Sequence, residues 1–187
     1  MAVAVETEVK PGKEIALDPE REYEIVNGQP EEKEMAGAKH GGVGHRLGRR
    51  LGLFVEDHQL GEVYGPDTTF LIGENQRLPD VAFVSAARMP AEGEPDGIWE
   101  IAPDLAVEVI SPNDVYDKVE DKLWDYFAAG VKQVWLVSLG KRTITVYRSP
   151  VDPVVFTEDQ ELVSEDLLPG FRCRLSEIFK SPARSQA

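Results

Sequence analysis

Cysteine is almost absent from this chain of 187 residues, which contains only Cys173. A single cysteine excludes an internal disulfide and a cysteine-based zinc site, and we interpret Cys173 as a small buried hydrophobe rather than a catalytic thiol. No apolar run approaches the roughly 20 residues that a membrane-spanning helix needs. The first residues, MAVAVETEVKPGKE, contain no basic segment followed by an apolar one, so we expect no signal peptide and a cytoplasmic protein.

Basic side chains are also scarce, because 20 Lys and Arg face 34 Asp and Glu and leave a formal net charge of -14. Such a charge repels nucleic acid at long range, which is evidence against tight, nonspecific DNA binding. It does not exclude a divalent metal ion, which acidic clusters attract. Hydrophobic residues make up 42% of the chain, an ordinary share for a soluble globular protein.

The length favours one domain with a sizeable core. Residues 1–15 are polar and without periodicity, which predicts a flexible N-terminal arm. We assign residues 16–180 to a single domain and residues 181–187, with the sequence SPARSQA, to a polar tail. The chain shows no internal repeat and no low-complexity segment.

Local patterns predict a hairpin and a long helix in the first third of the domain. Asn27-Gly28 lies between alternating segments and is a strong hairpin signal. A helix is expected from Lys39 to about His58, where apolar residues recur every three or four positions: Val43, Leu47, Leu51, Phe54 and Val55. Its other face carries His45, Arg46, Arg49 and Arg50. Such a basic patch is either a solvated face or a phosphate contact.

Strands and a second helix follow. One strand is expected within each of residues 61–73, 77–85 and 104–111, and a helix runs from about Val115 to Ala129 and ends at Gly130. Residues 131–138 and 142–149 read as two more strands, joined by a turn at Leu139-Gly140. This order predicts an α/β or α+β domain in which helices flank a mixed β-sheet.

Two carboxylates interrupt these apolar strands. Because side chains alternate across a strand, Glu108 shares a face with Ala106 and Ile110, and Asp80 shares one with Ala82 and Val84. An isolated buried carboxylate is costly, so it pairs, neutralises or binds a metal ion. Acids on adjacent strands would suit one hard cation such as Mg²⁺. A buried ion pair, or an acid at a wet strand end, explains the pattern equally well.

The second helix offers a lysine to this pair of acids. Helical phase assigns Val119, Leu123 and Phe127 to the core stripe and places Lys122 and Tyr126 at its edge. Lys122 is thus expected to reach over the sheet towards Glu108, whereas Lys118, one turn earlier, points more to solvent. The alternative is an ordinary edge lysine whose stem packs on apolar neighbours.

Several motifs in a fixed order resemble one family. LPDVAFV, DLAVEVISPND, KLWDYFAAGVKQVWLV and RTITVYR together look like the Uma-two-type restriction endonucleases, which belong to the PD-(D/E)XK nuclease superfamily. The resemblance runs from about Tyr23 to Phe179. It implies a restriction-endonuclease-like core, a mixed β-sheet between helices.

The resemblance also implies roles for particular residues. Pro79-Asp80 matches the PD element, and Glu108 matches the acid of the (D/E)XK element. Ile110 stands where that element has lysine, and the following helix supplies Lys122 instead. His40 resembles a recurrent histidine of the family, although we interpret it as a surface residue at the start of the first helix.

The implied function is a metal-dependent endonuclease that hydrolyses phosphodiester bonds of DNA. Asp80 and Glu108 would bind Mg²⁺ (or Mn²⁺), with the backbone carbonyl of Ile110 as a possible further ligand. Lys122 would orient the attacking water or stabilise the developing charge. Two alternatives stay open. The first is a non-catalytic nucleic-acid-associated or oligomeric module, and the second is a metal-dependent hydrolase of a small phosphorylated substrate, which fits the acidic charge.

Assembly and membrane contact can also be predicted. The apolar strands late in the chain suit a homo-oligomer, a dimer or higher, because nucleases of this superfamily often dimerise to cut two strands. No membrane association is expected.

Overall fold

The computed structural model describes residues 17–18, 21–33, 35–111 and 114–180. The predicted arm at residues 1–15 and the predicted tail at residues 181–187 lie outside the described residues. The described part contains, in chain order, β1 (Tyr23–Val26), β2 (Gln29–Glu32), α1 (Ala38–Asp57), β3 (Gly61–Tyr64), β4 (Phe70–Ile72), β5 (Asn75–Arg77), β6 (Val81–Ser85), the 3₁₀ helix η1 (Ala86–Arg88), β7 (Leu105–Ile110), α2 (Tyr116–Ala128), β8 (Gln133–Ser138), β9 (Thr143–Tyr147), β10 (Pro153–Thr157), β11 (Glu161–Val163), β12 (Arg172–Arg174) and α3 (Leu175–Phe179).

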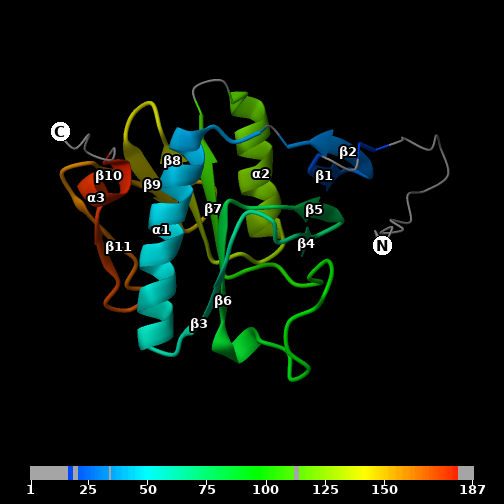
Figure 1. Ribbon diagram of the computed structural model, residues 1–187, viewed down its shortest axis with the longest axis horizontal. Helices are drawn as coiled ribbons and strands as arrows, with labels where there is room; N and C mark the ends of the chain where they lie inside the picture. The colour runs from blue at the N-terminus through cyan, green and yellow to red at the C-terminus, as the bar shows by residue number, and fades with distance from the viewer. Residues whose placement is uncertain (1–16, 19–20, 34, 112–113, 181–187) are drawn as a thin grey trace, which may run out of the picture.

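The centre of the molecule is a six-stranded mixed sheet in the order β10-β9-β8-β7-β6-β3 (Figure 1). Only the β7–β8 pair is parallel within this sheet, and α2 makes the crossover between its strands. Helices α1 and α3 pack on one face of the sheet, and α2 packs on the other. The predicted mixed α+β architecture, with helices flanking a mixed sheet, is therefore confirmed.

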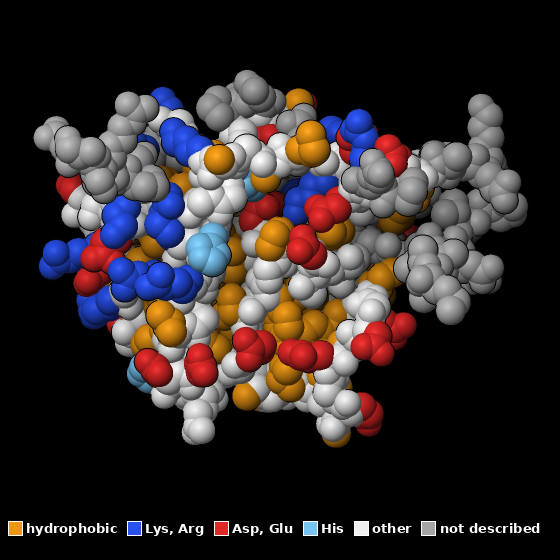
Figure 2. Space-filling model, in the orientation of Figure 1, with side chains coloured by type: hydrophobic (Ala, Val, Ile, Leu, Met, Phe, Trp, Pro, Cys, Tyr) orange, Lys and Arg blue, Asp and Glu red, His pale blue; other side chains and the backbone are white. Residues whose placement is uncertain are grey.

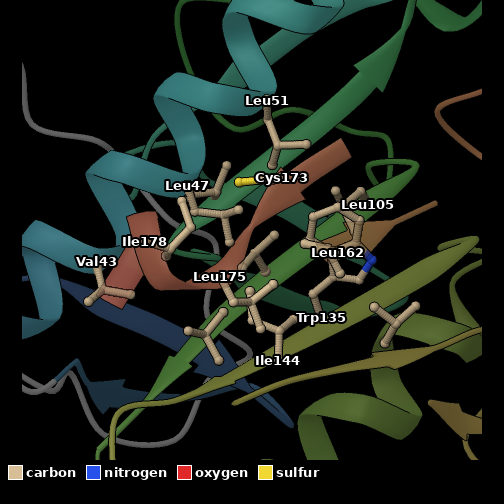
Figure 3. Close-up of a cluster of buried hydrophobic side chains, with 14 of the residues drawn as sticks. Val43, Leu47, Leu51, Leu105, Trp135, Ile144, Leu162, Cys173, Leu175 and Ile178 are labelled. Atoms are coloured by element: carbon tan, nitrogen blue, oxygen red, sulfur yellow. The ribbon is translucent and has the colours of Figure 1, made fainter. Parts of the chain in front are cut away.

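The larger core lies between α1, α3 and the sheet. The predicted apolar stripe of α1 is buried except for Phe54, which is partly buried, and Figure 3 shows Val43, Leu47 and Leu51 facing the strands. Cys173 lies in the same cluster at 4% exposure, so it is the buried hydrophobe that we expected. Burial raises the pKa of its thiol to about 11, which keeps it protonated at neutral pH.

The predicted hairpin is also present. Asn27 and Gly28 both take positive φ angles, 52° and 72°, as the tight turn between β1 and β2 requires. The hairpin belongs to a second, four-stranded antiparallel sheet in the order β2-β1-β5-β4. Figure 1 shows this smaller sheet beside α2, on the side of the central sheet opposite β10.

The boundaries of the strands before β7 differ from our prediction. Residues 61–73 form two strands instead of one, because β3 joins the central sheet and β4 joins the smaller one. A further strand, β5, was not predicted. β6 begins only at Val81, since Pro79 has no N–H to donate to a neighbouring strand. Asp80 therefore lies just before β6, at the end of the sheet rather than within it.

Candidate active site

The structure brings the two predicted acids together. Val81 pairs with Val107 in the antiparallel β6–β7 ladder, so Asp80, one residue before Val81, comes level with Glu108. The Val109 N–H donates to Asp80 Oδ2 at 2.7 Å and fixes this carboxylate beside the backbone of β7. Both acids are buried, at 8% and 6% exposure, and both line one cavity of about 300 Å³.

Lys122 reaches this cavity from α2. Its Nζ atom lies 3.3 Å from Glu108 Oε1 and 3.4 Å from Glu108 Oε2. Lys118 instead pairs with Glu31 at 2.8 Å, and its side chain is 68% exposed against 22% for Lys122. The two lysines thus lie as helical phase predicted, with Lys122 over the sheet and Lys118 towards solvent.

Sequence reasoning missed a third buried acid, Glu24 of β1. Its Oε1 atom accepts the Leu78 N–H at 3.0 Å and lies 2.9 Å from Lys122 Nζ. Its Oε2 atom accepts a hydrogen bond from Arg77 at 3.0 Å. The Lys122 ammonium therefore lies between two carboxylates. The sequence signal that could have identified Glu24 is the same as for Glu108. Each is an acid within a predicted strand in which apolar and polar residues alternate.

Arg77 connects the smaller sheet to α2. This guanidinium is only 4% exposed and donates to both Glu24 and Asp125. Asn75 Nδ2 also donates to Asp125, at 2.9 Å, and Asn75 Oδ1 accepts the N–H of Asn27 at 2.8 Å. The β1–β2 hairpin, β5 and α2 are thus joined by charged and amide side chains next to Lys122.

Tyr126 lies at a different place from the one predicted. We expected it at the edge of the apolar stripe, but it is fully buried, whereas Phe127 is only half-buried. Its hydroxyl donates to Glu108 Oε1 at 2.6 Å. Residues four apart share a helix face, so the phase that turns Lys122 to the sheet also turns Tyr126 there.

His40 and Lys33 approach Asp80 from the other side of the cavity. His40 Nε2 lies 3.4 Å from Asp80 Oδ2, and the histidine side chain is only 17% exposed, so its interpretation as a surface residue is wrong. Lys33 Nζ lies 3.7 Å from Asp80 Oδ1 and donates to the Leu78 carbonyl at 2.8 Å. Figure 2 shows acidic and basic side chains next to each other in a hollow between α1 and the β1–β2 hairpin.

The basic face of α1 is partly structural. Arg46 Nε donates to the Ile178 carbonyl at 2.7 Å, and Arg50 pairs with Glu177, so both side chains join α1 to α3. His45 and Arg49 are exposed and line a second groove beside β3. A phosphate contact by these two residues stays a hypothesis.

Burial and neighbouring charges set the protonation of the site. Burial raises the pKa of Glu108, and the negative charges of Asp80 and Glu24 add to this, against the opposing effect of Lys122. Burial alone would lower the pKa of Lys122, but the carboxylates of Glu108 and Glu24 outweigh it and raise that pKa above the usual range. An amine with a raised pKa is protonated at neutral pH, so Lys122 is a fixed cation here.

Asp80 and Glu108 are the two predicted metal ligands. Asp80 Oδ1 accepts no hydrogen bond from the residues that the structure describes, and its carboxylate lines the same cavity as Glu108. Within the described residues, no group of three or more His, Cys, Asp or Glu is arranged to hold a metal ion. Mg²⁺ needs only one or two carboxylates when water and a substrate phosphate complete its coordination, so Asp80 and Glu108 stay the predicted ligands of such an ion.

The acids Asp80, Glu108 and Glu24 thus meet Lys122 in one cavity beside the central mixed sheet. A family model described as "Putative restriction endonuclease" (Uma2) matches residues 13–176. The chain belongs to this family, which confirms the resemblance seen in its motifs.

Solved structures with a similar fold include the following one. It is described as a putative nuclease belonging to DUF820 from Anabaena variabilis ATCC 29413, with a TM-score of 0.77 and 21% sequence identity over 87% of this chain and 92% of that chain. At this identity the likeness shows the fold alone. No curated protein matches the chain. Among the described helices, none has the length and apolar character needed to cross a bilayer.

Proposed function

We propose that the protein is a metal-dependent endonuclease of the PD-(D/E)XK type that hydrolyses phosphodiester bonds of DNA. The observation that carries this proposal is the contact of the Lys122 ammonium with Glu108, 3.3 Å apart, in a cavity that Asp80 also lines. These are the residue types that phosphodiester hydrolysis requires: carboxylates for a metal ion and a cation for the developing charge. Membership in a family described as restriction endonucleases supports the same reaction.

Asp80 and Glu108 would hold Mg²⁺ or Mn²⁺, and such an ion, when bound, polarises the phosphate and lowers the pKa of bound water. The chain keeps both carboxylates in place beforehand. The Val109 N–H fixes Asp80, and the Tyr126 hydroxyl fixes Glu108. The protonated Lys122 is available to stabilise negative charge on the phosphate in the transition state.

Basic side chains at the cavity also support a phosphate-containing substrate. The Lys33 ammonium lies 3.7 Å from Asp80 and the His40 ring lies 3.4 Å from it, although the whole chain is strongly acidic. Local positive charge of this kind attracts a phosphate at short range despite the net charge. We further propose that the protein acts in the cytoplasm.

A cleavage assay with matched variants tests this function. Purified protein is expected to cut DNA with Mg²⁺ or Mn²⁺ and to stop when EDTA is added. Glu108→Gln should weaken Mn²⁺ binding, measured by calorimetry, because hard cations depend on carboxylate charge. Lys122→Met should spare Mn²⁺ binding and slow cleavage about 10²–10³-fold, as the loss of one preorganised electrostatic donor does. Lys141→Met removes an exposed lysine that does not line this cavity and should leave the rate unchanged.

The same panel separates the alternatives. Cleavage that persists in both site variants belongs to a contaminant and contradicts the proposal. If the protein binds DNA or RNA but cuts no single-stranded, duplex or branched form of either, the result favours the non-catalytic module. Hydrolysis of small phosphate esters without cleavage of DNA would favour the third class, the small-substrate hydrolase.

A homo-oligomer stays a prediction, and the end of the central sheet supports it. β10 is an edge strand, and Val154 and Val155 on it are 37% and 54% exposed. Edge strands with exposed apolar side chains are suited to pairing with another chain. Sedimentation of the wild type is expected to give twice the mass of the chain, and Val155→Lys should shift it towards the monomer. A wild type that sediments as a monomer at micromolar concentration contradicts this prediction.

A further inference from the structure

Glu24 holds the Lys122 ammonium more closely than Glu108 does. The distance from Lys122 Nζ is 2.9 Å to Glu24 Oε1 and 3.3 Å to Glu108 Oε1. Glu24 is 5% exposed, so salt screens this contact less than it would screen a surface ion pair. The carboxylate that sets the position of the ammonium is therefore not one of the two predicted metal ligands.

The position of Glu24 is itself fixed by groups outside α2 and β7. The Leu78 N–H and the Arg77 guanidinium each donate to it at 3.0 Å, and both belong to the segment around β5. Arg77 is held in turn by Asp125, so it does not depend on Glu24 alone. A lysine side chain is flexible and carries a point charge, so a second anchor restricts where its charge can lie.

We propose that Glu24 is a positioning residue of the nuclease reaction, which keeps the Lys122 ammonium beside Glu108 and aimed into the cavity. This inference rests on the proposed function. Without the Glu24 carboxylate, Glu108 would be the one close carboxylate left to the ammonium among the described residues, and the ammonium would be free to move with its stem. Glu24 does not touch the reacting atoms in this role; it acts through Lys122.

A double-mutant cycle, measured by cleavage kinetics, tests the positioning role of Glu24. Glu24→Gln keeps the size of the side chain and should lower kcat about tenfold to a hundredfold, part of the effect of a lost electrostatic donor, with KM little changed. In the Lys122→Met background, the same substitution should have no further effect on kcat. Glu22→Gln removes one charge from an exposed position beside β1 and serves as the control, with kcat expected to be unchanged. Effects of Glu24→Gln and Lys122→Met that simply multiply would overturn the proposal.

A second measurement does not depend on activity. In the wild type, the buried and hydrogen-bonded Lys122 ammonium should give a protected ¹H–¹⁵N signal, assigned by its loss in Lys122→Met. This signal should disappear or broaden in Glu24→Gln and stay in Glu22→Gln. An unchanged signal in Glu24→Gln would refute the positioning role even if cleavage is slower.

If Glu24→Gln does not fold, Glu24→Asp replaces it, because it keeps a charge for Arg77 but withdraws the carboxylate from Lys122 by one methylene. The same loss of kcat and of the ammonium signal is then expected, and wild-type values for both would overturn the proposal. A wild-type chain that cuts no nucleic acid refutes the nuclease function, and with it any catalytic consequence of Glu24. The ammonium signal then still decides whether Glu24 holds Lys122.

Discussion

The groups around Glu108 shift its pKa in opposite directions. Burial and the nearby carboxylates of Asp80 and Glu24 disfavour its charged form, whereas Lys122 and the Tyr126 hydroxyl favour it. A carboxylate in such surroundings is costly for folding, and a divalent cation would relieve the repulsion between the acids. The site therefore buries charged groups at a cost to the stability of the fold, which is typical of functional sites.

Tyr126→Phe separates the anchoring of Glu108 from its charge. The pKa of Tyr126 is raised well above its ordinary value by burial and by Glu108, so the hydroxyl stays a donor throughout the working pH range. Its loss should lower the free energy of unfolding by about 1 kcal/mol, as for a typical buried hydrogen bond. The rate of cleavage or the affinity for Mn²⁺ should fall about 10–100-fold, as when a group that orients a metal ligand is removed.

Urea unfolding and Mn²⁺ calorimetry measure these two effects. Tyr116→Phe is the control on the same helix, because Tyr116 is 74% exposed. Wild-type activity and wild-type Mn²⁺ affinity in Tyr126→Phe would show that Glu108 needs no such anchor.

The first residue of β3 shows how one backbone position allows two elements to meet. Gly61 has a φ of 146°, and a Cβ atom built there would lie 2.1 Å from the Val84 carbonyl oxygen. Only glycine permits this approach of β3 to β6 directly after α1. Because β6 leads back along the chain to Asp80, the register of this pair contributes to the position of the site.

Two glycine substitutions should therefore have opposite effects on stability. Gly61→Ala is expected to lower the free energy of unfolding by about 2–4 kcal/mol, because strained backbone and a clash with a neighbouring strand coincide. Gly52→Ala lies in the interior of α1, and its added Cβ would meet no described atom within 4 Å beyond the local helix backbone, so it should raise the free energy of unfolding by about 1 kcal/mol. Urea denaturation followed by circular dichroism measures both, and equal effects would contradict this account of Gly61.

At the scale of the whole molecule, a fourth buried acid, Asp104, joins the ends of several elements. Asp104 is fully buried, accepts the Ser85 N–H at 2.8 Å, and pairs with Lys132 at 2.8 Å and Arg88 at 3.4 Å. Burial alone would raise the pKa of Asp104, but these donors outweigh it and hold that pKa below the ordinary value. Asp104 thus stabilises the fold as a charged group at a distance from any proposed chemistry.

Asp104→Asn should destabilise the protein by about 1–3 kcal/mol at pH 7, as expected when a hydrogen bond to a charged group is lost. Because the folded-state pKa is lowered, the stabilisation is fully present above the unfolded value of 3.8 and is lost as pH falls through the folded value. The difference in unfolding free energy between wild type and variant should thus shrink below about pH 4. A difference that stays constant from pH 7 to pH 3 would show that the charge of Asp104 does not matter.

Strong local periodicity made much of the fold predictable. The α1 stripe, the Asn27-Gly28 turn and the apolar run of β7 each carry their own signal, and each was found where expected. The weak points were short strands such as β5, whose three residues are Asn75, Gln76 and Arg77. No apolar pattern marks such a strand, because pairing with β1 and β4 rather than its own side chains makes it a strand.

The sequence by itself indicated two acids and one lysine that lie close together. Strand alternation, helical phase and the motif order indicated Asp80, Glu108 and Lys122, because those periodicities are properties of the local backbone. Only the tertiary structure brought Glu24, Tyr126 and His40 to the same place. Glu24 is 98 residues from Lys122 along the chain. Its contact with Lys122 depends on how a separate small sheet packs beside α2. Local sequence does not encode such a contact, since it arises from packing between elements that are distant in the chain.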